Sequence, residues 1–166
     1  FMPHLQIEDF SQSKRQIVQK LRTLVADQLL DLQPEDFLNV LLGCMNDQAA
    51  GSWLDDWSPM QELQQSGFAF LVSPGVNTVE AVGENEDGAP GDMLVRYTVG
   101  PQQHVEILQN GAVRLLQLKE NIRTIWRTCG NTHWGTVTDA AMLSKALRVG
   151  FIIFSNESQG QNQWIY

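Results

Sequence analysis

Apolar residues in the N-terminal third of the chain recur at the spacing of amphipathic helices. Ser13 is a suitable N-cap for a first helix, because the residues after it gather one apolar face. This face is made by Ile17, Leu21, Leu24, Val25 and Leu29. Pro34 suits the first turn of a second helix, which Gly51 ends, and residues 58–67 predict a third helix between a serine cap and a terminal glycine.

The middle of the chain changes to a strand-like pattern. Residues 68–72 (FAFLV) form a compact apolar run that predicts a buried strand, and residues 93–99 (MLVRYTV) predict a second strand. Residues 104–118 predict two short strands joined by a hairpin turn at Asn110-Gly111. The acidic, Gly- and Pro-rich residues 83–92 are typical of a loop.

Helical spacing returns in the C-terminal third. Residues 118–126 predict a helix, and Thr136 with Asp139 forms a capping box for another helix that Gly150 ends. The run FIIF, residues 151–154, is apolar on both faces, which is typical of a strand in the middle of a covered sheet.

These patterns predict one α+β domain with α/β-like features, in which helices flank a small central β-sheet. The 166 residues are enough for one domain with its own core, and the apolar fraction of 43% is typical of a globular protein. We assign the whole chain, residues 1–166, to this domain, with residues 68–116 as a candidate inserted β region. The sequence begins with Phe1 rather than Met, so we expect a fragment or a processed chain.

Charge, hydropathy and cysteine content limit the classes of partner and the cellular compartment that we expect. The formal net charge is −8 and the basic residues are scattered, which argues against nucleic acid, because phosphate binding needs a clustered basic face. No apolar run approaches the roughly 20 residues of a membrane span, and no signal peptide is present, so we expect no membrane partner. The two cysteines form no CxxC pair and the composition is not that of a disulfide scaffold, which favours a reducing, cytosolic compartment.

His104 is the histidine best placed for chemistry. It lies at the start of an apparent strand (QQHVEIL), directly after Gly100-Pro101, and a base on a rigid strand end is typical of Cys-His sites. The alternative is an ordinary surface histidine at the start of a strand. His4 lies near one end of the chain, and His133 precedes an aromatic residue in a predicted turn, where packing roles are common.

The sequence does not identify a nucleophile. Cys44 shares the apolar face of the second predicted helix with Phe37 and Leu41, where a thiol acts as a small hydrophobic group. Cys129 has His133 four residues later, but nothing orients the pair. The chain has no phosphate-binding glycine loop and no thiolate metal pattern, so we expect no cofactor and no metal.

The stretch HWGTVTDAAMLSKALRVGFIIFSN, residues 133–156, resembles the Trp-Gly segment of the OTU (ovarian tumour) family of cysteine proteases. That family carries Trp-Gly, three residues, an acidic residue, a helix rich in Ala, Leu and Ser, and a short aliphatic strand. The matching positions are Trp134, Gly135, Asp139, Leu143, Leu147 and Ile152-Ile153. Residues 21–41 resemble the helix that follows the family's nucleophile helix, and residues 122–126 (IRTIW) resemble the stretch before Trp-Gly.

The resemblance implies an OTU-like cysteine-protease architecture and a deubiquitinase function. In such enzymes a Cys thiolate attacks the isopeptide carbonyl at the C-terminus of ubiquitin, and a His serves as general base and acid. The implied partners are ubiquitin or ubiquitin chains. An effector delivered to a host cytosol would fit the same compartment.

The departures from the family leave alternatives open. The family's Asp-Gly-x-Cys motif stands nowhere in this sequence, and its His strand normally comes near the end of the domain, so we expect a domain that is incomplete at both ends. The segment HVEIL also matches the His-strand pattern, so a rearranged order with His104 as the base is a second possibility. A non-catalytic module that binds ubiquitin or another protein is the alternative from a different class.

Overall fold

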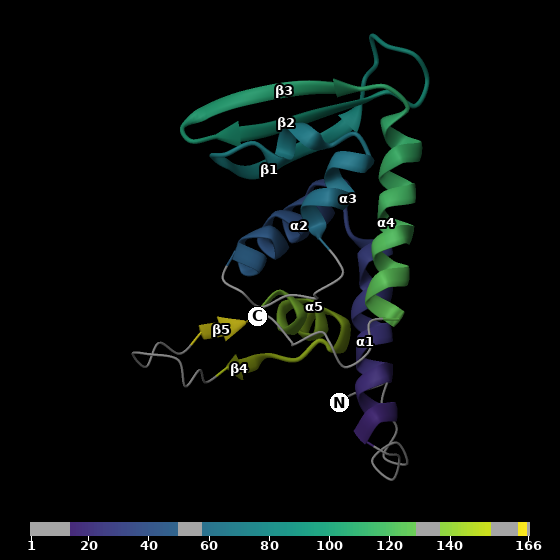
Figure 1. Ribbon diagram of the computed structural model, residues 1–166, viewed down its shortest axis with the longest axis vertical. Helices are drawn as coiled ribbons and strands as arrows, with labels where there is room; N and C mark the ends of the chain where they lie inside the picture. The colour runs from purple at the N-terminus through teal and green to yellow at the C-terminus, as the bar shows by residue number, and fades with distance from the viewer. Residues whose placement is uncertain (1–13, 50–57, 129–136, 154–162, 166) are drawn as a thin grey trace.

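Helices and short antiparallel strands make up the computed structural model, which describes residues 14–49, 58–128, 137–153 and 163–165 (Figure 1). The helices are α1 (Lys14–Asp31), α2 (Pro34–Ala49), α3 (Pro59–Gln65), the 3₁₀ helix η2 (Ala69–Val72), α4 (Gly111–Thr128) and α5 (Val137–Leu147). The strands are β1 (Val76–Glu84), β2 (Met93–Val99), β3 (Gln102–Leu108), β4 (Phe151–Ile153) and β5 (Gln163–Ile165). The prediction of an α+β fold is confirmed. The predicted capping residues Ser13 and Thr136, and Gly51, lie outside the described residues.

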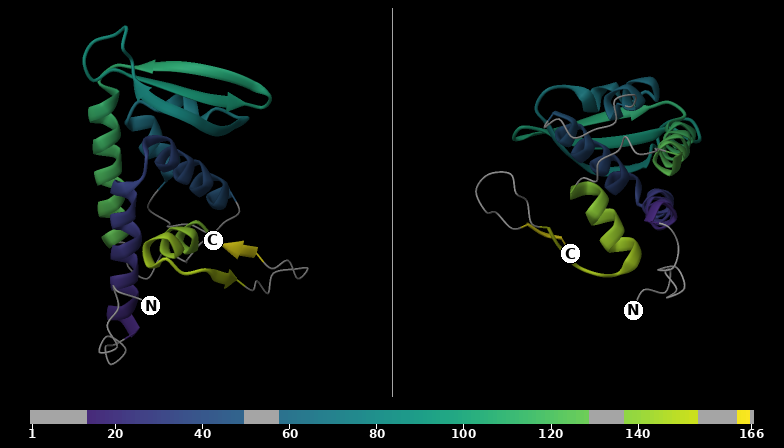
Figure 2. Two further views of the ribbon diagram at one scale, coloured as in Figure 1. Left: turned by 180° about the vertical axis from the view of Figure 1, so that it is seen from behind. Right: turned by 60° about the horizontal axis from the view of Figure 1, so that its bottom comes forward.

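The two long helices α1 and α4 lie side by side and antiparallel, and they connect the two ends of the molecule (Figures 1 and 2). The three-stranded sheet β1–β2–β3 lies at one end, above α2 and α3. Helix α5 and the strand pair β4–β5 lie at the other end, with α5 against α1. The three-stranded sheet and the elements that follow α4 in the sequence therefore lie at opposite ends of the molecule.

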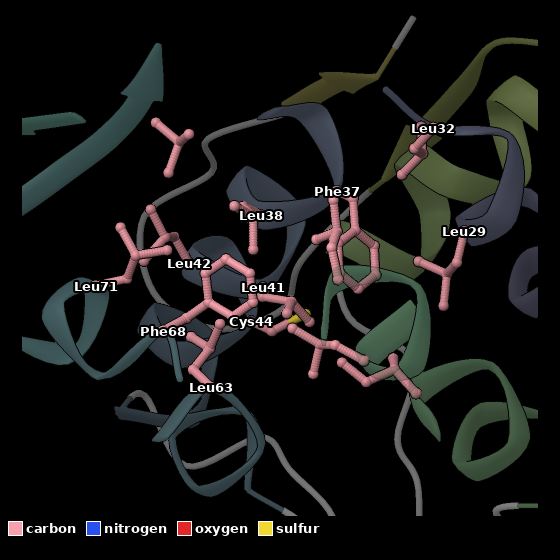
Figure 3. Close-up of a cluster of buried hydrophobic side chains, with 14 of the residues drawn as sticks. Leu29, Leu32, Phe37, Leu38, Leu41, Leu42, Cys44, Leu63, Phe68 and Leu71 are labelled. Atoms are coloured by element: carbon pink, nitrogen blue, oxygen red, sulfur yellow. The ribbon is translucent and has the colours of Figure 1, made fainter. Parts of the chain in front are cut away.

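The core lies where α2 meets α1, α3 and η2 (Figure 3). The predicted apolar face of α2 is confirmed, because its side chains are fully or nearly fully buried. The labelled members of this cluster are Leu29, Leu32, Phe37, Leu38, Leu41, Leu42, Cys44, Leu63, Phe68 and Leu71. At about 1.5–3 kcal/mol for each large apolar side chain that is removed from water, this cluster supplies much of the driving force for folding.

A buried lysine fastens α4 to the junction between α1 and α2. The Nζ of Lys119 donates to the carbonyl oxygen of Leu32 at 2.6 Å and lies 5.6 Å from the centre of the Phe37 ring. Burial lowers the pKa of Lys119, and the charge of Asp31 partly opposes this shift. The ammonium thus satisfies a carbonyl just beyond the C-terminal end of α1, where a positive charge is favourable.

The strand order of the larger sheet is β1–β2–β3, and all its pairs are antiparallel. Strands β2 and β3 pair in uninterrupted register from Met93–Leu108 to Val99–Gln102, so only Gly100 and Pro101 form the turn. Gly100 has a φ of +56°, and a glycine at the first turn position followed by proline suits a type II′ hairpin. Strand β1 is less regular, because it has register shifts on either side of Thr78–Val79.

Residues 69–72 form the 3₁₀ helix η2, so the strand predicted over residues 68–72 is wrong. Phe68 and Leu71 are buried at i and i+3, which is the spacing of a 3₁₀ turn, and the Leu71 N–H donates to the Phe68 carbonyl at 3.0 Å. The preceding helix α3 behaves as predicted. Ser58 caps it through the N–H of Gln61, and Gly67 ends it with a φ of +88°.

The hairpin predicted at Asn110-Gly111 is also wrong, because this dipeptide connects β3 to α4. Asn110 adopts a left-handed φ of 53° and its carbonyl accepts the N–H of Arg114 in the first turn of α4. A Cβ on Gly111 would lie 2.7 Å from the Cβ of Met93, so only glycine lets α4 begin against β2. Residues 111–118 are therefore helical, and the last part of the predicted β region 68–116 belongs to α4.

The run at 151–154 does not enter a central sheet. Its described residues, Phe151–Ile153, pair only with Gln163–Ile165 in a separate two-stranded sheet. The physical reason is the length of α4, since 18 helical residues carry the chain about 27 Å away from β3. The prediction of one sheet that includes this strand is therefore wrong.

Asp92 joins the loop after β1 to the start of α4. One carboxylate oxygen accepts the N–H of Asn110 at 3.0 Å and the other accepts the N–H of Ala89 at 3.1 Å. The side chain is nearly buried, with 9% of its residue surface exposed. Two charge-assisted bonds from backbone groups far apart in sequence make it the main polar contact of this junction.

We expect Asp92→Ala to lower the free energy of unfolding by about 2 kcal/mol, because it leaves two backbone donors unsatisfied near the protein interior. Urea denaturation followed by circular dichroism measures this loss. Asp87→Ala, in the same loop but exposed, is the matched control and should leave the midpoint unchanged. Equal shifts for the two variants would contradict the role of Asp92.

Helix α5 ends at an arginine in a conformation that favours glycine. Arg148 has a φ of +55°, and the N–H of Val149 donates back to the carbonyl of Ser144 at 3.2 Å, as in a Schellman motif. The predicted terminator, Gly150, lies two residues further on. A side chain at a left-handed position costs roughly 1 kcal/mol relative to glycine.

Arg148→Gly should therefore raise the free energy of unfolding by about 0.5–1 kcal/mol. Arg148→Ala is the control, because it removes the same charge and keeps a Cβ at the same φ. Thermal denaturation of the two variants separates the effect of backbone conformation from that of charge. A gain in the alanine variant as large as in the glycine variant would contradict the explanation.

Candidate functional site

His104 lies near the start of β3, as its sequence position predicts. It is directly opposite Tyr97 on β2, and the two rings stack with centroids 5.7 Å apart and planes inclined by 26°. Tyr97 is buried, whereas His104 is exposed. The imidazole therefore has a fixed aromatic neighbour on one side and solvent on the other.

Glu106 completes a small polar group on this face of the sheet. Because side chains two residues apart in a strand point to the same side, His104 and Glu106 both lie on the side of Tyr97. Burial raises the pKa of Tyr97, and the charge and hydrogen-bonding of Glu106 raise it further. The group therefore contains a phenol, an imidazole and a carboxylate on two adjacent strands.

The structure does not bring this group to Cys44. The thiol of Cys44 is fully buried on α2, and α2 packs against β1, so β2 lies between that strand and His104. Cys129, His4 and His133 lie outside the described residues. The assignment of His104 as a catalytic base stays a prediction, and none of the described residues next to it is a thiol.

A second candidate site is a groove of about 930 Å³ between α2 and α5. Its lining is mainly apolar and contains the charged side chains of Asp36, Lys145 and Arg148. Ser144 at its edge is buried, and its hydroxyl donates to the carbonyl of Val149. The groove joins two segments about 100 residues apart, so it depends on the tertiary packing of α5.

Sequence reasoning missed both the partners of His104 and this groove. The period-two pattern of residues 102–108 could have placed Glu106 beside His104, whereas Tyr97 needed the register of the hairpin. No local signal in α2 or α5 predicts the groove, because neither helix forms it alone.

Among the described residues, no group of three or more His, Cys, Asp or Glu side chains is arranged to hold a metal ion. Crossing a bilayer requires a long and predominantly apolar helix, and none of the helices within the described part of the chain meets this requirement.

Comparisons with known proteins do not assign the chain to a family. No protein-family model, no curated protein and no solved structure matches it.

The polar group on the sheet predicts a specific dependence of stability on pH. A raised pKa means that folding favours neutral Tyr97, so its contribution is present below about pH 10 and is lost as the pH rises through the folded-state value. Tyr97→Phe removes this loss. We expect its free energy of unfolding to fall less steeply than that of the wild type in urea titrations above about pH 10.

Lys119→Met is a control whose expected effect on the pH dependence of stability is opposite to that of Tyr97→Phe. Because the pKa of Lys119 is lowered on folding, its contribution rises with pH up to the unfolded value of 10.5. Replacing Lys119 should therefore make the free energy of unfolding fall more steeply with pH in the alkaline range. Identical slopes for wild type and Tyr97→Phe would show that the hydroxyl of Tyr97 does not titrate differently in the folded state.

Proposed function

We propose that this chain is part of an OTU-like deubiquitinase domain, with ubiquitin or ubiquitin chains as its substrate. The observation that carries the proposal is the packing of the segments that resemble that family. They are distant in sequence, yet in the structure α1, α2, the end of α4 and α5 form one continuous body. Segments that belong to one structural unit must pack together, as these segments do.

Specific contacts join these segments. Arg123, within the IRTIW stretch, donates from Nε to a carboxylate oxygen of Asp27 in α1 at 2.9 Å. Just outside these segments, the side chain of Gln19 in α1 donates to the carbonyl of Arg127 in α4 at 2.6 Å. Met142 of α5 is buried in the same apolar cluster as the residues of α1 and α2. The region 68–116, proposed as an insertion, supplies instead the three-stranded sheet at the far end.

The proposed reaction needs an accessible thiolate. In this reaction the thiolate adds to the isopeptide carbonyl, the lysine amine leaves with a proton from the histidine, and water then releases the acyl group. Cys44 does not suit this role, because its side chain is fully buried in the middle of α2. Cys44 is therefore a core residue, and the nucleophile is unassigned. The proposed compartment is the reducing cytosol that the sequence favours.

A non-catalytic module that binds ubiquitin or another protein is the second candidate. It is favoured by the apolar side chains that the sheet and α4 expose. Val105 and Ile107 of β3 and Val113 and Leu116 of α4 each expose half or more of their surface. Such residues are typical of protein contacts when they are grouped.

A ubiquitin derivative with a cysteine-reactive group at its C-terminus tests the proposal. We expect the protein at its natural length to gain the mass of one ubiquitin, and Cys44→Ala to react as fast as the wild type because the thiol is buried. Intact mass spectrometry gives the adduct, and Cys129→Ala shows whether that thiol is the one modified.

Ubiquitin labelled with ¹⁵N distinguishes the two candidates. Shifts of its amide resonances without a covalent adduct would favour the binding module. The absence of both an adduct and any shift would contradict the proposal that ubiquitin is the partner.

A further inference from the structure

The two edges of the three-stranded sheet are protected to very different degrees. At the β1 edge, the amide of Asn39 from α2 donates to the carbonyl of Val79 at 2.7 Å and accepts the Val79 N–H at 2.9 Å. Register shifts at Asn77 and Glu80 distort the same strand. Bulges and covering groups of this kind prevent a strand edge from pairing with another chain.

Within the described residues, strand β3 has no register shift, and Glu106 is its one charged residue. Its register with β2 is uninterrupted over seven residues, and its sequence, QQHVEIL, contains no proline and no lysine. All its residues are exposed except Leu108, which is half-buried, and in Figure 1 it is the outermost strand of the sheet. A regular, exposed edge with apolar residues is a template for strand pairing.

We propose that β3 is an interface with a second copy of this chain. The two β3 strands pair antiparallel across a two-fold axis, which joins two three-stranded sheets into one. The proposal concerns assembly and does not depend on ubiquitin as the substrate. His104 and Glu106 are exposed, although they lie on the same face of the sheet as buried Tyr97 and Val95.

Symmetry restricts the register, and charge complementarity favours one of the permitted registers. A two-fold axis perpendicular to the sheet must pass beside a single residue of β3, because side chains that are opposite each other point to the same face. Centring the axis at Glu106 would oppose two like charges. Centring it at His104 would oppose two imidazoles and place Val105 against Gln103.

Centring the axis at Val105 makes the strand complementary to itself. Each His104 then lies opposite Glu106 of the other copy, so the imidazole N–H can donate to a carboxylate in two equivalent pairs. The two Val105 side chains meet on the opposite face. Ile107 lies next to Leu94 on that face, so an apolar strip runs through the axis.

The experiment measures oligomeric state by sedimentation velocity over a range of micromolar concentrations. We expect a wild-type dimer, and we expect Val105→Lys to be monomeric, because two ammonium groups would then meet at the axis. Val113→Lys is the matched control, since Val113 is 60% exposed on α4 and Val105 is 50% exposed on β3. This control should remain dimeric, and circular dichroism checks that both variants fold.

A charge exchange tests the register itself. His104→Glu alone places two carboxylates in each cross-strand pair and should weaken the dimer by about tenfold. The double variant His104→Glu/Glu106→Lys restores opposite charges and should recover the wild-type dissociation constant. A structural defect caused by either substitution would not be repaired in this way.

A monomeric wild type at every concentration would overturn the proposal. So would a dimer that Val105→Lys leaves intact, or open-ended oligomers, which indicate pairing of unlike edges. A dimer that is lost in His104→Glu but not recovered in the double variant would overturn the register. None of these results depends on ubiquitin, so they leave the proposed function to its own test.

Discussion

The antiparallel packing of α4 on α1 is the constraint on which the other parts of the structure depend. The buried side chains of Leu118 and Ile122 pack α4 against the core. In the first half of α4, Lys119 donates to the carbonyl of Leu32. In its second half, Arg123 donates to the carboxylate of Asp27. The apolar contacts supply most of the stabilisation, because the ion pair is partly exposed and such pairs contribute roughly 0–1 kcal/mol. The polar contacts determine the position of α4 along the axis of α1.

This packing decides what the two halves of the chain can contact. Helix α4 starts at the sheet and ends beside the middle of α1, and α5 packs against α1 away from the sheet. His104 and the described part of the segment that resembles the Trp-Gly unit, residues 137–153, therefore lie at opposite ends of the molecule. A catalytic role for His104 would need its partner thiol to come to the sheet, and Cys44 is held in the core.

Helices α1 to α3, α5 and the second half of α4 could be predicted from the sequence because their signals are local. Ser58, Pro59 and Gly67 specify the ends of α3 without any tertiary contact, and the apolar face of α2 follows from its period. The errors arose where short apolar runs are ambiguous. Residues 68–72 fit a strand or a 3₁₀ turn equally well, and only the packing of Phe68 and Leu71 decides between them.

The candidate sites were less predictable, since they depend on contacts between distant segments. Asn110-Gly111 has the composition of a hairpin turn, but the close approach of Gly111 to Met93 and the bond from Asn110 to Asp92 convert it into a helix start. The position of His104 followed from local sequence. The pairing of His104 with Tyr97 could be identified only from the strand register, and the groove between α2 and α5 only from the folded structure.

The two roles considered for His104 compete for the same atoms. A general base must present a ring nitrogen to a proton on a nucleophile or water, within hydrogen-bonding distance. In the proposed pairing of β3 strands, that nitrogen faces Glu106 of the second copy, and the Tyr97 ring covers one side of the imidazole. Strand pairing would thus remove His104 from solvent on the side where a substrate must approach. The exposed edge of β3 is therefore better suited to assembly than to general-base catalysis.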